Sequence, residues 1–434
     1  MLAESSVNQP PKNWASSFFP IWIGQAFSLL GSQLVQFALI WWLTSTTGSA
    51  TVLATATLVG LLPQVFLMPI AGTFVDRWNR RVTMIVADGL VAMATLTLVV
   101  LFWMGNVQVW QVYLIMFVRA AAGSFHWPAM QASTSLMVPE KHLSRVQGLN
   151  QMLNGGLNII AAPLGAVLLA VLPMQGVLLV DIGTALLAIL PLIFVAVPQP
   201  ARSSASAALG EKPSALQDFR AGLRYVMGWP GLMIIGIMAT LINLLLTPAY
   251  ALMPILVTKH FNGGAMQFAG MESAFSIGII LGGLILSVWG GFHRRIYTSM
   301  MGLIGIGIGS VMIGLLPASA FYLAIFSALL MGFAQPITNG PLFAALQAVV
   351  APDMQGRVFT LVGSVAAAMT PLGLIVAGPV ADAFGVQSWF VVGGLVTLGM
   401  AFGGMLIPAV VNFEKGAAAE PSQPAADIAL AEGD

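Results

Sequence analysis

The chain has 434 residues, of which 58% are apolar and only 7% are Asp, Glu, Lys or Arg. Soluble globular proteins carry about 25% charged residues, so this chain could not cover a water-facing surface, which excludes a soluble enzyme. The net charge of +1 gives no reason to expect nucleic acid as a partner, and the lack of cysteine excludes disulfides and thiol chemistry. Lipid is therefore the solvent for most of the chain.

Residues 1–17 lack a basic stretch followed by a short apolar run and a cleavage site. We therefore expect no cleavable signal peptide, and the first apolar helix should act as the insertion signal. Residues 1–17 would then form a cytoplasmic N-terminal segment.

Runs of about 20 mostly apolar residues predict membrane-spanning helices. Breaking such runs at charged, Pro, Gly and polar clusters predicts twelve spans, near 18–43, 51–74, 82–104, 108–130, 146–171, 174–197, 231–257, 267–290, 296–316, 318–345, 358–381 and 387–411. These spans predict an N-terminal six-helix half (18–197), a cytoplasmic linker (198–230), a C-terminal six-helix half (231–411) and a disordered cytoplasmic tail (412–434).

Within the linker, residues 214–229 place apolar side chains at helical spacing, with Arg220 and Arg224 on another face. This pattern predicts an amphipathic helix on the membrane surface.

The Lys and Arg residues predict the orientation of the chain. If the N-terminus is cytoplasmic, fourteen of the 16 basic residues fall on the cytoplasmic side, Lys259 falls in an outer loop and Arg119 lies inside a span. The fourteen are Lys12, Arg77, Arg80, Arg81, Lys141, Arg145, Arg202, Lys212, Arg220, Arg224, Arg294, Arg295, Arg357 and Lys415. The positive-inside rule then places both termini in the cytoplasm and supports an even number of spans.

The sequence contains an internal repeat. Pro128 is followed eleven residues later by Pro139 and an acid, and Pro341 is followed eleven residues later by Pro352 and an acid. Because both six-helix segments start on the same side, they are parallel repeats related by an axis along the membrane normal. The expected fold is therefore an all-α membrane protein with two pseudo-symmetric halves.

The most specific motif, GTFVDRWNRR at 72–81, lies between the second and third spans. It resembles the signature G-x-x-x-D-R-x-x-R-[RK] of the major facilitator superfamily, in which this loop latches the cytoplasmic gate. The alternative is a positive-inside turn with one stray carboxylate. The residues assigned to the gate are Gly72, Asp76, Arg77, Arg80 and Arg81, together with Asp88, which we expect to pair with Arg81, and Arg357 from the second half.

Further segments, at 21–34, 75–89, 119–132, 138–143 and 356–364, resemble the macrolide-efflux branch of that superfamily, which is close to bacterial siderophore exporters. The resemblance implies a twelve-helix major facilitator fold in the inner membrane of a bacterium.

Arg119 lies midway along the fourth span, where an unpaired charge costs about 3 kcal/mol or more, so it should face the bundle interior or a water-filled cavity. With Gly123 it resembles the R-x-x-x-G motif of proton-coupled exporters. The alternative is a structural arginine that bonds helix carbonyls or extends to the interface.

Acids inside spans are the other candidates for coupling. Asp181 and Glu272 could each carry a proton or bind a cationic substrate, or they could be solvated carboxylates at helix ends. His126 lies two turns after Arg119 on the same face and could carry a proton or be a structural histidine. We expect Asp382 to be an interfacial carboxylate without a role.

Amide and aromatic side chains inside the spans are candidates for contact with a substrate. The candidates are Gln25, Gln33, Gln36, Trp127, Asn243, Gln335 and Asn339. With 24 Met and 24 Phe, the interior is adaptable and suits a bulky amphiphile better than a sugar. The sequence shows no metal-ligand or nucleotide-binding pattern, so we expect no metal, no cofactor and no direct use of ATP.

These observations predict a secondary active exporter rather than an enzyme, driven by protons and working by rocking alternating access. We expect a monomer in the lipid bilayer whose substrates are bulky hydrophobic or amphiphilic small molecules such as macrolides. One alternative is an exporter of a siderophore or another endogenous metabolite. The other is a membrane sensor or assembly subunit that does not transport.

Overall fold

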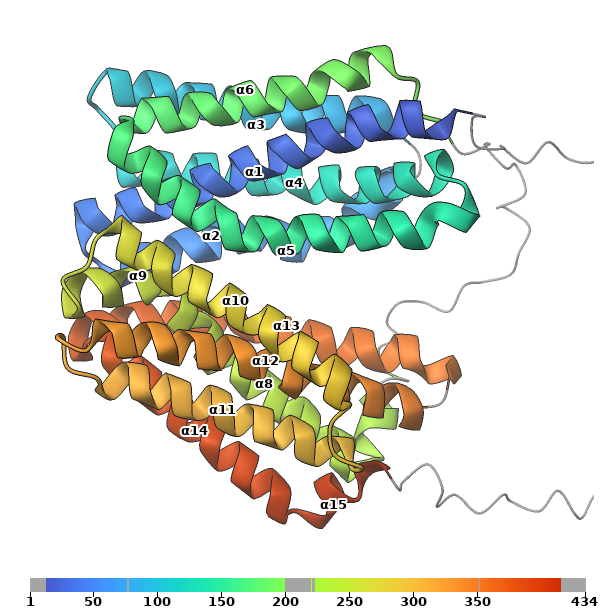
Figure 1. Ribbon diagram of the computed structural model, residues 1–434, viewed down its shortest axis with the longest axis vertical. Helices are drawn as coiled ribbons and strands as arrows, with labels where there is room; N and C mark the ends of the chain where they lie inside the picture. Colours follow the sequence, from blue (N-terminus) through green and yellow to red (C-terminus); the bar gives the residue numbers. More distant parts are fainter. Residues whose placement is uncertain (1–12, 76–77, 200–219, 221–222, 351, 415–434) are drawn as a thin grey trace, which may run out of the picture.

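A computed structural model describes residues 13–75, 78–199, 220, 223–350 and 352–414. All elements in these residues are helical, and twelve of them have 21 or more residues (Figure 1). The long helices are α1 (Trp14–Thr47), α2 (Ala50–Val75), α3 (Arg80–Trp103), α4 (Val109–Met137), α5 (Glu140–Val171), α6 (Met174–Phe194), α8 (Pro230–Ala251), α10 (Ala265–Trp289), α11 (Arg295–Leu315), α12 (Phe321–Val349), α13 (Pro352–Phe384) and α14 (Val386–Leu406). The short elements are α9 (Met253–Ile255), the π-helix η2 (Leu256–His260) and α15 (Pro408–Val411).

Eleven of the long helices are apolar enough over their length to cross a membrane. The twelfth is α4, which is 29 residues long and carries Arg119 and His126 among its apolar residues. The predicted all-α membrane fold is confirmed.

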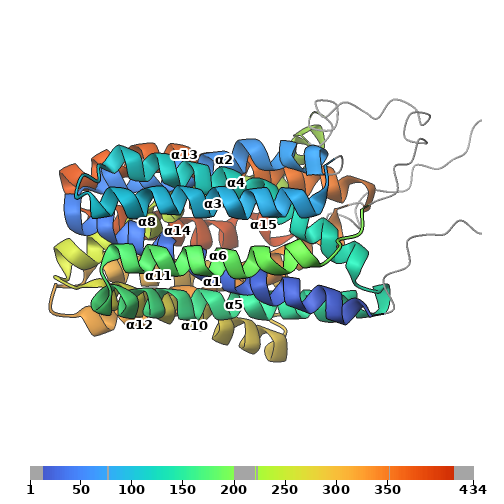
Figure 2. The ribbon, with the colours of Figure 1, turned by 90° about the horizontal axis from the view of Figure 1, so that it is seen from above.

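The long helices run roughly parallel to one another, as Figures 1 and 2 show from two directions. We call the end where α6 finishes and α8 begins the linker end, and the end where α1 finishes and α2 begins the far end. Several helices extend beyond the predicted spans, because hydropathy marks only the apolar part of a helix that continues into polar sequence. Helix α1 begins at Trp14 rather than at 18, and α5 begins at Glu140 rather than at 146.

The helices of the two halves pack in the same pattern. In the first half α2 and α3 contact α4, and α3 contacts α6; in the second half α10 and α11 contact α12, and α11 contacts α14. Helices α4 and α12 both have 29 residues and contain the repeated prolines Pro128 and Pro341.

Most of the contact between the halves is made by α2 with α13 and by α5 with α10, and α1 with α9 and α2 with α8 add smaller contacts. Figure 1 shows the halves close together at the far end and further apart toward the linker end. Phe37 and Ala162 from the first half and Leu246, Phe268 and Ala377 from the second belong to one buried apolar cluster. Burial of apolar surface from both halves stabilises their contact.

The seventh predicted span, 231–257, is not one continuous helix. Helix α8 ends at Ala251, and the chain continues through α9 into a π-helix that ends at His260. Pro248 and Pro254 flank the break, and each proline removes a backbone donor and clashes with the preceding turn.

Several predicted features lie outside the described residues. They include Asp76 and Arg77, residues 1–12, most of the linker helix expected at 214–229, and the tail from 415 onward. Within the described part of the linker, residues 223–227 are helical.

Candidate functional site

A cavity of about 840 Å³ lies between the two halves. Helices α1 to α5 of the first half form most of its wall, and α8, α9 and α10 of the second half complete it. Cavities that hold drug-sized ligands have volumes of about 300–1,000 Å³. The volume is therefore sufficient for a large organic molecule.

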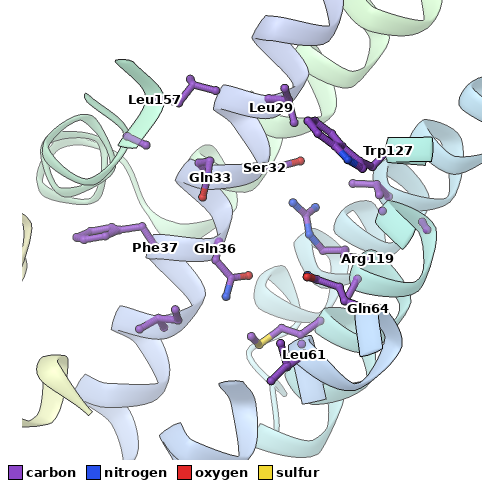
Figure 3. A pocket seen from close by; sticks show the side chains of 18 of the residues that line it. Leu29, Ser32, Gln33, Gln36, Phe37, Leu61, Gln64, Arg119, Trp127 and Leu157 are labelled. Atoms are coloured by element: carbon purple, nitrogen blue, oxygen red, sulfur yellow. The ribbon is translucent and has the colours of Figure 1, made fainter. Parts of the chain in front are cut away.

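The wall from the first half is rich in neutral polar groups. Gln33 and Gln36 from α1 line the cavity with Gln64 from α2. Figure 3 shows Gln36 facing Gln64 and Arg119 from the opposite side of the cavity, while Trp127 lies nearby on α4. Amides both donate and accept hydrogen bonds, so this wall can bind hydroxyl, ester and ketone groups.

The wall from the second half is aromatic and acidic. Tyr250 and Pro254 line it with Phe268 and Glu272 from α10. Phe268 stacks against Phe37 of the first half, with ring centroids 5.2 Å apart and planes 10° apart. This aromatic contact joins the two halves at the cavity wall.

Arg119 belongs to a polar cluster that links four helices of the first half. Its Nη1 lies 2.5 Å from Oδ2 of Asp181 on α6 and also donates to Oγ1 of Thr95 on α3. Thr95 donates to the same carboxylate at 2.9 Å, and Ser32 from α1 donates to its other oxygen at 3.4 Å. Arg119 lines the cavity, while Asp181 is 1% exposed and lies behind it. The ion pair offsets the cost of burying both charges.

A second polar cluster lies nearer the linker end. Gln25 of α1 donates from Nε2 to Oδ2 of Asp88 on α3 at 2.9 Å, and Nε2 of His126 on α4 lies 3.5 Å from Oδ1 of the same carboxylate. All three residues line the cavity.

The two clusters are aligned along the same three helices. Gln25 and Ser32 on α1, Asp88 and Thr95 on α3, and Arg119 and His126 on α4 are each separated by seven residues. Seven residues are about two helical turns, or about 10.5 Å along the axis, so the clusters form two layers on the same helix faces.

The described part of the gate motif connects helices at the linker end. Arg80 is 7% exposed and donates from Nη1 to the Ala132 carbonyl at 2.7 Å, and Arg81 donates to the carbonyls of Leu192 and Ile193 at the end of α6. The guanidinium of Arg81 thus satisfies carbonyls that a helix end leaves free. The expected pairing of Arg81 with Asp88 is corrected, because Asp88 instead bonds Gln25 and lies beside His126.

Two other gate residues lie in helices of the linker-end region. Gly72 is part of α2, and Arg357 is part of α13, where it contacts the Met354 sulfur at 3.7 Å.

Three predicted substrate contacts do not line this cavity. Asn243 of α8 bonds the Ala239 carbonyl of its own helix at 3.0 Å. Gln335 and Asn339 lie on α12, which packs against α10 and α11 rather than against the first half. The sequence shows that a polar residue lies inside a span but not which face of the helix it occupies. The predicted contacts of these three residues with a substrate were wrong for this reason. Gln25, Gln33, Gln36 and Trp127 do line the cavity.

Asp382 has a specific contact that the sequence did not reveal. It lies near the end of α13 and accepts hydrogen bonds from the backbone N–H groups of Ala50 at 2.7 Å and Thr51 at 2.9 Å, and from Ser49 Oγ at 3.0 Å. A carboxylate of the second half thus caps the N-terminus of α2 in the first half. We call this contact the far-end latch.

Gly378, one turn before Asp382, allows the latch to form. A Cβ atom at Gly378 would lie 2.7 Å from Thr51 Cα and 3.2 Å from Ala54 Cβ. The absence of a side chain therefore lets α13 and α2 approach closely.

Gln64, Tyr250 and Thr95 also belong to the site, although the sequence did not predict them. Gln64 is a lone amide in an apolar run, so its polarity was an available signal. Thr95 was not identifiable, because a threonine in a helix commonly bonds its own backbone, as Thr95 also does to Val91.

The family sequence model of the Major Facilitator Superfamily matches residues 21–373 of the chain. The chain belongs to the Major Facilitator Superfamily. It is therefore a membrane transporter and not an enzyme, and the resemblance seen in the motif at 72–81 is confirmed.

Several relatives are named for efflux. Macrolide efflux protein A of Streptococcus pyogenes is 32% identical over 394 residues, covering 90% of this chain and 95% of that protein. Macrolide efflux protein A of Enterococcus faecalis is 30% identical, covering 75% and 100%. The multidrug efflux pump Tap of Mycolicibacterium fortuitum is 28% identical, covering 83% and 88%. The similarity to the macrolide-efflux branch is thus confirmed.

Solved transporters share the fold. A structure of the nucleoside transporter NupG matches with a TM-score of 0.67 at 12% identity, covering 91% of this transporter and 99% of that chain. A bacterial homologue of the human lysosomal transporter Spinster, in an inward-facing conformation, matches with a TM-score of 0.66 and covers 94% and 98%.

Proposed function

We propose that this transporter exports bulky hydrophobic or amphiphilic compounds, such as macrolides, by proton antiport. The observation that carries the proposal is the cavity of about 840 Å³ whose wall combines amides with aromatic rings, in a chain similar over 90% of its length to a macrolide efflux protein. Such a wall binds large ligands with scattered oxygen atoms better than small sugars.

We propose that the linker end faces the cytoplasm of a bacterial cell. Arg80, Arg81, Arg294 and Arg295 lie at or next to helix ends there, while Lys259 lies in η2 at the opposite end. This distribution follows the positive-inside rule.

We propose that transport occurs by rocking of the halves. The far-end latch and the stacking of Phe268 on Phe37 connect the halves at the far end. In the outward-open state these contacts would break, and the linker ends of α2 and α13 would approach each other.

We propose that protons act on the two polar layers of the first half. Protonation of Asp181 would remove the charge that holds Arg119, and a freed guanidinium would change the polarity of the cavity wall. Asp88 and His126 lie between this pair and the linker end, so they are placed to carry protons released toward the cytoplasm. Glu272 is the remaining carboxylate among the described residues of the wall.

The test is accumulation of a radiolabelled macrolide in bacteria with and without the protein, before and after a protonophore. We expect lower accumulation in cells that produce the protein, and loss of this difference when the protonophore is added. Asp181→Asn should abolish the difference. Ser45→Ala should keep it, because among the described residues the Ser45 hydroxyl bonds the Trp42 carbonyl of its own helix and no residue of another helix. Equal accumulation in all cells would refute export of this compound.

A further inference from the structure

The charges of the cavity wall are unevenly compensated. Four acidic or basic side chains among the described residues line the cavity: Asp88, Arg119, His126 and Glu272. Arg119 is neutralised by Asp181, and Asp88 accepts a hydrogen bond from Gln25 and lies beside His126. The described residues provide Glu272 with neither a hydrogen-bond donor nor a cationic partner, although its side chain is exposed in the cavity.

A carboxylate in this position lacks the charged or polar partner that such a group normally has. Charged groups within a membrane protein normally face a cavity and pair with a charge or a polar group, because an isolated charge is costly. The second half provides no cation to Glu272 among the described residues, so a cationic ligand could supply the missing partner.

The surroundings of Glu272 fit a particular kind of cation. Tyr250 lines the same cavity as Glu272, and so does Phe268, which lies one helical turn before Glu272 on α10. Aromatic rings attract cations through their faces and also contact alkyl groups. A carboxylate among aromatic rings therefore fits an alkylated ammonium group better than a metal ion, which needs several oxygen ligands.

The opposite wall complements this arrangement. Gln33, Gln36 and Gln64 offer neutral hydrogen-bonding groups on the side of the first half. A ligand that carries one amine and several neutral oxygen atoms could contact Glu272 at one end and the amides at the other.

We propose that Glu272 determines specificity by binding a protonated alkylamine of the substrate. The transporter then prefers amphiphiles that carry a basic amine over neutral compounds of the same size and shape. This inference rests on the proposed export function and adds the chemical class of its substrates.

The experiment measures binding of two matched probes to the purified full-length protein in lipid nanodiscs. The first probe is a macrolide with a dimethylamino sugar, and the second is the same macrolide with that amine converted to its neutral N-oxide. Wild-type protein should bind the amine at least about tenfold more tightly than the N-oxide, as expected for a charge-assisted interaction.

Two variants distinguish the role of the charge. Glu272→Gln keeps the shape of the side chain but removes its charge, so the preference for the amine should fall to less than about twofold while N-oxide binding is kept. Glu272→Asp keeps the charge and should keep most of the preference. Retained N-oxide binding in Glu272→Gln also shows that this variant is folded.

The results separate this inference from the proposed function. Wild-type protein that binds both probes equally, or a Glu272→Gln variant that keeps the wild-type preference, overturns the role of Glu272 and leaves macrolide export intact. A Glu272→Gln variant that loses both probes equally also overturns it, because the charge would not be what selects. Wild-type protein that binds neither probe overturns the proposed function and this inference together.

Discussion

The far-end latch predicts how the balance between the two states of the transporter can be shifted. Asp382 accepts two backbone hydrogen bonds from the first turn of α2 and a third from Ser49. Replacing it by Ala leaves the N–H groups of Ala50 and Thr51 without this partner while the halves are in contact. In the proposed outward-open state those groups would bond water in both proteins, so the change should destabilise only the latched state.

The magnitude follows from helix capping. Removing a capping side chain costs about 0.5–2 kcal/mol, and Asp382 is exposed, which reduces its electrostatic contribution through solvent screening. After this reduction we expect about 0.5–1 kcal/mol, which corresponds to about a 2- to 5-fold change in the ratio of the two states. Asp382→Asn keeps one acceptor oxygen but loses the charge, so its effect should be smaller.

The assay is the distance between two spin labels at the far end. The chain has no cysteine, so Asn106→Cys and Ala318→Cys provide unique labelling positions in exposed loops of the two halves. Pulsed electron resonance in nanodiscs should show a larger population of long distances in Asp382→Ala than in the parent. Ser45→Ala serves as the control, since its hydroxyl bonds only within α1. Unchanged distances in Asp382→Ala would refute a contribution of the latch.

Three further changes test other parts of the site. Gly378→Leu should open the far end more than Asp382→Ala does, because even a Cβ atom would lie 2.7 Å from Thr51 Cα; the same spin labels measure this, and an unchanged distance would contradict the packing argument. Arg119→Gln should reduce proton-driven macrolide transport in inverted vesicles at least about tenfold, because it leaves Asp181 as a buried unpaired acid; transport equal to wild type would exclude a coupling role. Gln64→Leu should weaken macrolide binding by about fivefold, because it removes one hydrogen bond to the ligand. Titration of the protein in nanodiscs measures this, and an affinity within twofold of wild type would show that Gln64 does not contact the ligand.

The sequence was sufficient to predict the membrane fold, because each span has its own apolar run. The scarcity of charge identified lipid as the solvent, and the repeated prolines Pro128 and Pro341 lie in helices of equal length. Helix ends were less predictable. Hydropathy does not detect the polar first turns of α5, and it does not show that Pro248 and Pro254 interrupt the seventh span.

The composition of the site was predictable only in part. Arg119 and Asp181 were recognised as costly charges inside spans, but their pairing depends on how α4 and α6 lie across α3. Asp382 was judged to have no role, since a carboxylate at the end of a span is usually solvated. Its partner is the start of a helix 332 residues away along the chain. No local pattern in the sequence reports such a contact.

The two halves are similar in packing but different in chemistry. The first half contains both polar layers. In one layer Arg119 pairs with Asp181, and in the other Asp88 lies beside His126. The second half contributes Glu272 to the cavity and Asp382 to the latch. In the proposed mechanism, a proton bound in the first half would therefore affect a ligand bound to Glu272 only through the shared cavity wall or through the relative position of the halves. The polar layer nearer the linker end, formed by Asp88 on α3 and His126 on α4, has no counterpart among the described second-half residues that line the cavity. This chemical difference distinguishes the two halves of a pseudo-symmetric fold.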